Sequence, residues 1–176
     1  VTYHVYFGTD PDDLPLWTST TSTSVTKSGL SLGTTYYWWV VAEDDNGAES
    51  PGEVWHFKTN TPPSTPSSPD PSDGETHCPT SLTLSWSGGD PDGDSVTYHV
   101  YFGTGSDPPF DQDTTSTSLT KSGLAGGATY YWRVVSEDAQ GAQSSGPVWS
   151  FTTNSYPTEP AGPSPPDGAT GQPTSV

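Results

Sequence analysis

Three carboxylates at alternate positions are the residues of this sequence best suited to chemistry. Asp90, Asp92 and Asp94 lie in the stretch DPDGD, where Pro91 restricts the backbone and Gly93 permits a positive φ. Calcium binds about six to eight oxygen atoms, which carboxylates and carbonyls on a tightly turned backbone supply. The pattern therefore predicts a structural calcium site. The alternative is a solvated turn in which Asp and Gly only favour the bend.

The elements on both sides of this turn must position it, and their pattern is that of strands. Apolar residues alternate with polar ones over residues 82–86 (LTLSW) and again over residues 98–102 (YHVYF). Side chains two positions apart lie on the same face of a strand. The sequence therefore predicts two strands that face one core and are joined by the acidic turn.

The chain contains an internal repeat. The stretch VTYHVYFGT occupies residues 1–9 and again residues 96–104. The Ser/Thr-rich stretch that follows, predicted to be a strand in both copies, matches between residues 20–30 and 114–124. We expect a partial repeat over 1–60, a Pro/Ser-rich linker and first-strand region over 61–73, the remainder of a complete repeat over 74–154, and a linker with the start of a third repeat over 155–176.

Neither residues 1–60 nor residues 155–176 contain the part equivalent to residues 83–95, which holds the strand with the core tryptophan. Residues 155–176 begin a copy that residues 1–60 would continue. Strand addition between molecules is one interpretation, in which the tail of one chain completes the head of the next. We favour the other interpretation, a fragment of a longer array.

Composition restricts the kinds of partner. Four basic residues against 21 acidic ones give a net charge of −17, which argues against nucleic acid, because phosphate binding needs clustered Lys and Arg. Seven Trp and nine Tyr supply enough aromatic area for a small core. The sequence has no run of about 18 apolar residues, so no membrane-spanning segment is expected in this window. Cys78 has no second cysteine to pair with in the chain.

Catalysis has little support in the sequence. The four histidines, His4, His56, His77 and His99, do not pair at metal-ligand spacing. We find no nucleophile elbow, no Gly-rich phosphate loop and no Cys–His arrangement. The prediction is a protein that is not an enzyme and has no catalytic residues.

The repeat resembles a fibronectin type III domain, an immunoglobulin-like β-sandwich. Leu84 and Trp86 resemble the second strand of that fold, and residues 98–103 resemble its third strand. Leu124, followed six residues later by Tyr130, resembles the tyrosine corner. Tandem domains of this kind are typical of archaeal and bacterial extracellular or cell-surface proteins. The resemblance implies an all-β fold of tandem fibronectin type III-like β-sandwiches.

The resemblance adds further candidates to the acidic turn. In such a sandwich the loop after the sixth strand lies at the same end as the DPDGD turn, which would bring Glu137 and Asp138 close to it. Glu43 and Asp44 are their equivalents in the first copy. Calcium bound there would stiffen the joint between neighbouring domains.

An aromatic outer face is the second candidate site. If Tyr98, Val100 and Phe102 point inward, the residues between them point outward. Exposed aromatic patches usually mark contacts, and lateral packing between copies of the protein is favoured over binding of sugar rings. The outward residues are His99, Tyr101, Tyr131 and Arg133 in the second copy and His4, Tyr6, Tyr37 and Trp39 in the first.

Serine and threonine together with proline are also typical of O-glycosylated stalks. The candidate acceptors are Thr61, Ser64, Thr65, Ser67 and Ser68. The function expected from the sequence is that of a structural repeat in an extracellular rod or surface fibre, with copies of the same protein as partners and glycans on the surface. The alternative is a carbohydrate-binding or spacer module of a secreted hydrolase or adhesin.

Overall fold

The computed structural model describes residues 1–155, 157 and 168–171, and within them every regular element is a β-strand. The prediction of an all-β fold is confirmed. The expected start of a third repeat falls largely outside the described residues. Among the described residues there is no helix of the length and apolarity needed to cross a membrane.

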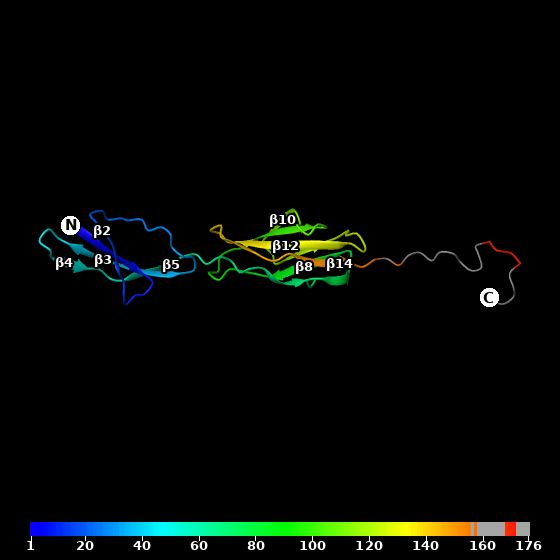
Figure 1. Ribbon diagram of the computed structural model, residues 1–176, viewed down its shortest axis with the longest axis horizontal. Coiled ribbons are helices and arrows are strands. Elements are labelled where there is room, and N and C mark those ends of the chain that lie inside the picture. Colours follow the sequence, from blue (N-terminus) through cyan, green and yellow to red (C-terminus); the bar gives the residue numbers. More distant parts are fainter. Residues whose placement is uncertain (156, 158–167, 172–176) are drawn as a thin grey trace.

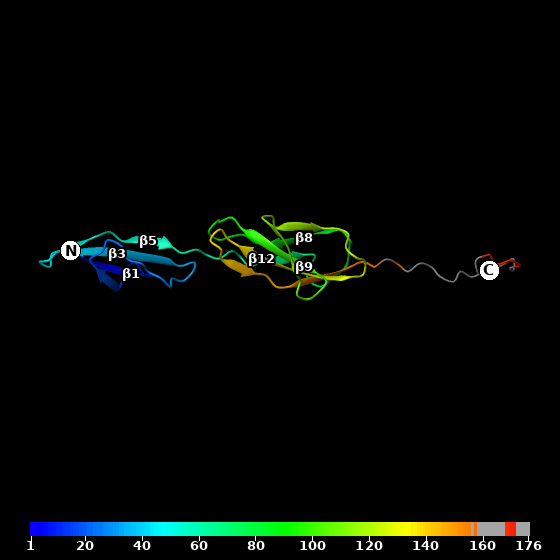
Figure 2. The same cartoon turned by 90° about the horizontal axis from the view of Figure 1, so that it is seen from above.

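The first repeat, residues 1–60, forms a single antiparallel sheet. The central pair is β1 (Thr2–Gly8) with β3 (Thr35–Glu43), and their register runs from Thr2 opposite Glu43 to Gly8 opposite Tyr37. The remaining strands are β2 (Leu16–Thr20) beside β1, and β4 (Glu49–Pro51) and β5 (Trp55–Lys58) beside β3. Figure 2 shows these strands as one layer.

The second repeat, residues 61–154, forms two sheets. The larger sheet contains β10 (Phe110–Thr114), β9 (Thr97–Gly103), β12 (Thr129–Glu137), β14 (Trp149–Thr153) and β7 (Glu75–Cys78), with β13 (Gln143–Ser145) also paired to β12. The smaller sheet contains β11 (Ser118–Lys121), β8 (Leu82–Ser87) and β6 (Ser67–Asp70). The two repeats follow each other along the long axis of the molecule (Figure 1).

The core of the second repeat lies between its two sheets. Leu84 and Trp86 from β8 pack against Val100 of β9, Trp132 of β12 and Phe151 of β14. Leu84, Val100, Trp132 and Phe151 have no exposed surface, and Trp86 is 5% exposed. The predicted period-two alternation of β8 and β9 is confirmed, because the intervening residues are not part of this core.

A tyrosine corner is present in each repeat. The Tyr130 hydroxyl accepts a hydrogen bond from the backbone N–H of Ala125 at 2.9 Å, and the Tyr36 hydroxyl accepts one from Ser31 at 3.0 Å. Both bonds reach back five residues along the chain, as in immunoglobulin-like sandwiches. The sequence resemblance at Tyr130 therefore agrees with the structure in both copies.

The first repeat differs from the sandwich expected of it. Residues 24–27, equivalent to β11, do not form a strand, so the prediction of a Ser/Thr-rich strand there is wrong. In the second repeat β11 pairs with β8 along its whole length, whereas this sequence begins after the position equivalent to β8. Without that partner the backbone of residues 24–27 has no ladder to join, and only one sheet forms.

The Pro/Ser-rich stretch after the first repeat packs onto the second. Pro63, Pro66 and Pro71 are buried, and the stretch contains strand β6, which pairs with β8. The N–H of Ser64 donates to the carbonyl of Gly89 at 2.8 Å. Buried proline loses little conformational entropy on folding, so this segment fixes the start of the second repeat instead of acting as a free spacer.

Matched substitutions test the difference between the two repeats. Phe151 has no exposed surface, whereas the equivalent Phe57 is 39% exposed. We expect Phe151→Ala to lower the free energy of unfolding of the second repeat by about 3–5 kcal/mol, because it leaves a cavity in a closed core. Phe57→Ala should cost the first repeat about half of that or less. Denaturant titration followed by NMR signals of each repeat measures both values, and equal costs would contradict the difference in packing.

Candidate functional site

The predicted acidic turn lies at the joint between the two repeats. The Asp92 carboxylate accepts hydrogen bonds from the Lys58 ammonium at 2.6 Å and from the Thr61 N–H at 2.6 Å, with the Thr61 hydroxyl at 3.1 Å. The Lys58 hydrogen bond and then the Thr61 N–H hold the pKa of Asp92 below its usual value. Asp92 therefore ties the last strand of the first repeat to the turn between β8 and β9.

Asp138 makes a second connection at the same joint. Its Oδ2 accepts a hydrogen bond from the Asn60 side-chain amide at 2.7 Å, and its Oδ1 accepts from the N–H groups of Gln140 and Ala142. Asp138 is only 5% exposed, and the bond from Asn60 is the main cause of its lowered pKa. The predicted proximity of the Asp138 loop to the DPDGD turn agrees with these contacts, which reach the same short segment, residues 58–61.

Calcium at this joint stays a prediction. In the part of the chain that the structure describes, no group of three or more His, Cys, Asp or Glu side chains is arranged to hold a metal ion. Asp90 Oδ1 accepts the N–H groups of Asp92 and Asp94, at 2.7 and 3.3 Å. In these bonds an aspartate of the turn closes the turn itself. This is the arrangement expected for a solvated turn, the alternative to a calcium site.

The equivalent acidic pair of the first repeat has the same local roles. Asp44 closes its turn by accepting the N–H groups of Asn46 and Ala48, at 2.8 and 2.9 Å. Both bonds lower the pKa of Asp44, and the bond from Ala48 has the larger effect on it. Glu43 lies 2.6 Å from His4 Nε2.

The two predicted outward histidines bridge strands. His99 Nδ1 lies 2.6 Å from Asp113 on β10, and Nε2 lies 3.3 Å from Glu137 on β12. Burial acts to lower the pKa of His99, but its bonds to the two carboxylates outweigh burial and raise this pKa above 6.5. His4 has the same position in the first repeat, 2.8 Å from the Ser19 hydroxyl. Both histidines therefore connect three strands of the outer face.

The outward aromatic residues pack against neighbours on their own sheet. The Arg133 guanidinium lies over the Tyr101 ring at 4.5 Å, and the rings of Tyr6 and Trp39 are 4.8 Å apart. The other two, Tyr37 and Tyr131, are also partly buried, and Tyr37 lies against His56. A contact surface at these residues stays a prediction.

The glycosylation candidates differ in accessibility. Ser64, Thr65, Ser67 and Ser68 are exposed, whereas Thr61 is partly buried and uses its hydroxyl in the joint with Asp92. Modification of any of them stays a prediction.

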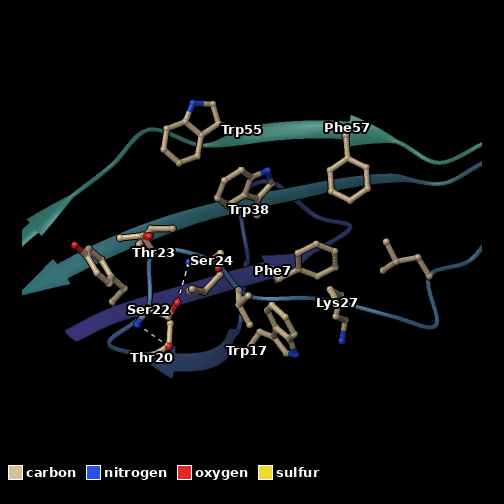
Figure 3. Close-up of a pocket in the computed structure, with 15 residues that line it drawn as sticks. Phe7, Trp17, Thr20, Ser22, Thr23, Ser24, Lys27, Trp38, Trp55 and Phe57 are labelled. Atoms are coloured by element: carbon tan, nitrogen blue, oxygen red, sulfur yellow. Dashed lines mark hydrogen bonds between the residues drawn. The ribbon is translucent and has the colours of Figure 1, made fainter. Parts of the chain in front are cut away.

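An apolar groove on the first repeat was not among the sites predicted from the sequence. The groove has a volume of about 600 Å³ and runs over the inner face of β1, β3 and β5. Figure 3 shows the rings of Phe7, Trp38, Trp55 and Phe57 on this face, with the segment from Thr20 to Lys27 along one side. The Lys27 ammonium lies 4.9 Å from the centre of the Trp17 ring.

The tryptophan side chains on this face are more exposed to solvent than their equivalents in the second repeat. Trp55 is 44% exposed, whereas its equivalent Trp149 is 5% exposed. Trp38 is partly exposed, whereas Trp132 is fully buried. In the second repeat β8 covers the equivalent side chains, and this sequence begins after the position equivalent to β8.

The sequence is similar in part to that of a known protein. No family model matches this chain. It is 31% identical over 144 residues to Chitinase A1 of Niallia circulans, a match that covers 79% of this chain. The chain spans only 19% of the length of that relative.

Two solved structures resemble the chain at low similarity. The fibronectin type III domain of human fibronectin type III domain containing protein 3 gives a TM-score of 0.42 at 22% identity, covering 60% of this chain and 98% of that one. The FN1–FN3 domains of chicken CNTN1 give a TM-score of 0.42 at 15% identity, covering 90% and 58%. The fold described above follows from the strand order, the core and the tyrosine corners of this chain itself.

The bridge made by His99 predicts a pH dependence of stability. A group whose pKa is raised by folding stabilises the folded state below its unfolded pKa, and this contribution is lost as the pH rises through the folded value. We expect the second repeat to lose stability as the pH rises from about 6 to about 8. His99→Gln should remove that part of the profile. Urea titrations at several pH values measure it, and parallel profiles for the two proteins would contradict the bridge.

Proposed function

We propose that this chain is a structural spacer of an extracellular protein, in which consecutive β-sandwich repeats are held end to end. The observation that carries the proposal is the joint, where the Lys58–Asp92 and Asn60–Asp138 bonds connect two repeats. Free linkers leave neighbouring domains to move independently, whereas side-chain contacts across a short linker restrict their relative motion. Restricted motion between the repeats supports the role of a spacer, because a spacer must hold its neighbours at a defined distance and direction.

The docked linker supports the same role. Thr61 begins the connection and is already bonded to Asp92, and three residues later Ser64 is bonded to the second repeat through Gly89. The Ser136 hydroxyl donates to the Ser64 carbonyl at 2.9 Å. Few residues of the connection are therefore free to change conformation, and the two prolines at 62 and 63 restrict them further.

The proposed setting is a secreted hydrolase. The 31% identity to Chitinase A1 extends over 144 residues, which is more than one repeat, and corresponds to 19% of that protein. A spacer of this kind would separate an enzymatic part from another module. The rod or surface fibre expected from the sequence would differ from such a spacer. It would need lateral contacts between copies through their outer faces, for example at Tyr101 and Tyr131.

Carbohydrate binding is the second candidate function, and the adjacent rings of Tyr6 and Trp39 favour it. Aromatic rings on a sheet surface offer a platform on which sugar rings stack. If the chain is only a spacer, it should stay in solution when insoluble chitin is sedimented. Retention that is lost in Trp39→Ala would favour the carbohydrate-binding function instead.

The joint is tested by removing one charge. We expect Asp92→Asn to widen the distribution of angles between the repeats, because the neutral amide loses the ion pair with Lys58 and can no longer accept with both atoms. Small-angle scattering and residual dipolar couplings of the full chain measure this. Asp45→Asn removes the same charge at a position remote from the joint, where the Asp45 side chain is 96% exposed, and should leave the angles unchanged.

Acid provides a second test of the same joint. Because the folded-state pKa of Asp92 and Asp138 is lowered, their contribution is present above the usual aspartate value and is lost as the pH falls through the lowered values. The joint should stay closed at neutral pH and loosen below about pH 4. Angles that already vary widely at pH 7 would contradict the spacer proposal.

A further inference from the structure

The first repeat has a smaller hollow on the outer face of its sheet, around Trp39. Trp39 lies on the opposite side of β3 from Trp38, because successive side chains of a strand point to opposite faces. The hollow has a volume of about 300 Å³ and is lined by Pro11, Asp12, Asp13, Leu14, Trp39 and Val54. In the complete second repeat this face is also open to solvent, since Tyr101 and Arg133 are partly exposed there.

The loop that lines the hollow is held against the sheet. Asp10 Oδ1 accepts the N–H of Asp12 at 3.0 Å, and the Phe7 N–H donates to the Pro15 carbonyl at 3.1 Å. A Cβ atom at Gly8 would lie 3.2 Å from Leu14 Cδ2, so glycine allows the loop to pack this closely on β1. The lining side chains are therefore positioned before a ligand binds.

The lining has an apolar part and a charged part. Pro11, Leu14, Trp39 and Val54 supply the apolar part. Asp12 and Asp13 are exposed, and in the part of the chain that the structure describes they form no ion pair. Carboxylates without a basic partner beside an indole ring favour a cationic ligand, because the charges and the face of a tryptophan ring both attract cations.

The second repeat already holds a cation at the corresponding place. Arg133 stands where the first repeat has Trp39, and its guanidinium lies over the Tyr101 ring at 4.5 Å. In the first repeat the ring of Tyr6, the equivalent of Tyr101, lies 4.8 Å from the ring of Trp39. One repeat therefore supplies its own cation to this face, whereas the other presents a second ring and two carboxylates.

We infer that the hollow binds a sugar ring that carries an amine, as in an oligomer of glucosamine. The apolar C–H face of the sugar packs on Trp39, and its ammonium group lies beside Asp12 and Asp13. A sugar ring has an apolar face and a polar edge, which match the two parts of the lining, whereas a lysine side chain has no polar edge apart from its ammonium group. The inference rests on the carbohydrate-binding function and specifies the class of sugar.

A titration with a defined oligosaccharide tests this inference. The probe is a tetramer of glucosamine, added to the full 176-residue chain at a mildly acidic pH, at which the amines carry protons and the aspartates stay ionised. A saturable shift is expected in the indole NMR signal of Trp39. The signals of Trp132 and Trp149, which are buried in the second repeat, should not move.

The N-acetylated tetramer is the matched control ligand, because it has the same rings without the charge. It should bind at least about tenfold more weakly, since it loses the attraction to two carboxylates and to the indole face.

Variants of the first repeat locate the site. Trp39→Arg gives the first repeat the residue of the second, and should weaken binding of the glucosamine tetramer at least about tenfold. Asp12→Asn and Asp13→Asn should each weaken it about threefold. Asp45→Asn removes the same charge at the opposite end of β1, where Asp45 lies 3.6 Å from the Val1 amino group, and should leave the affinity unchanged. Isothermal titration calorimetry measures all four affinities.

Three results would overturn the inference. The first is the absence of a saturable shift at Trp39. The second is equal affinity for the N-acetylated tetramer, which would leave the carbohydrate-binding function in place without a preference for amines. The third is tetralysine binding at Trp39 as tightly as the glucosamine tetramer, which would identify a basic peptide as the ligand. The spacer proposal is tested separately, because it depends on the joint at Asp92.

Discussion

An aromatic sheet of this kind depends on a second sheet to cover its apolar face. In the second repeat, β8 supplies that cover with Leu84 and Trp86, and the rings of Trp132, Trp149 and Phe151 lose nearly all contact with water. In the first repeat the strands pair in the same way, and Trp55 and Phe57 remain partly exposed. Strand pairing within the sheet is therefore common to both repeats, whereas burial of the aromatic side chains depends on β8.

This dependence also explains the irregular segment of the first repeat. Residues 24–27 have almost the sequence of β11, yet only β11 forms a strand. The intrinsic strand propensity of these residues decides their conformation less than pairing with a neighbouring strand does. The smaller sheet of the second repeat therefore depends on β8, because both β11 and β6 pair with it.

Most of the fold was accessible from the sequence. Alternation at 82–86 and 98–102 predicted the strands and their inward faces, and Tyr130 predicted the corner. The joint was less accessible, because Lys58 and Asn60 lie at the end of one repeat and meet Asp92 and Asp138 of the next only through the path of the linker. The charge of Asp92 can be read from the sequence but its partner cannot, so the sequence led to a calcium site or a solvated turn and not to Lys58.

The two side-chain contacts at the joint between the repeats differ in their exposure to solvent. The Asn60 amide meets a carboxylate that is almost fully buried, whereas the Lys58 side chain is 48% exposed where it meets Asp92. Ions in solution screen exposed charges strongly and buried contacts much less. Added salt should therefore weaken the Lys58–Asp92 pair more than the Asn60–Asp138 contact, so the two contacts hold the repeats together under different ionic conditions.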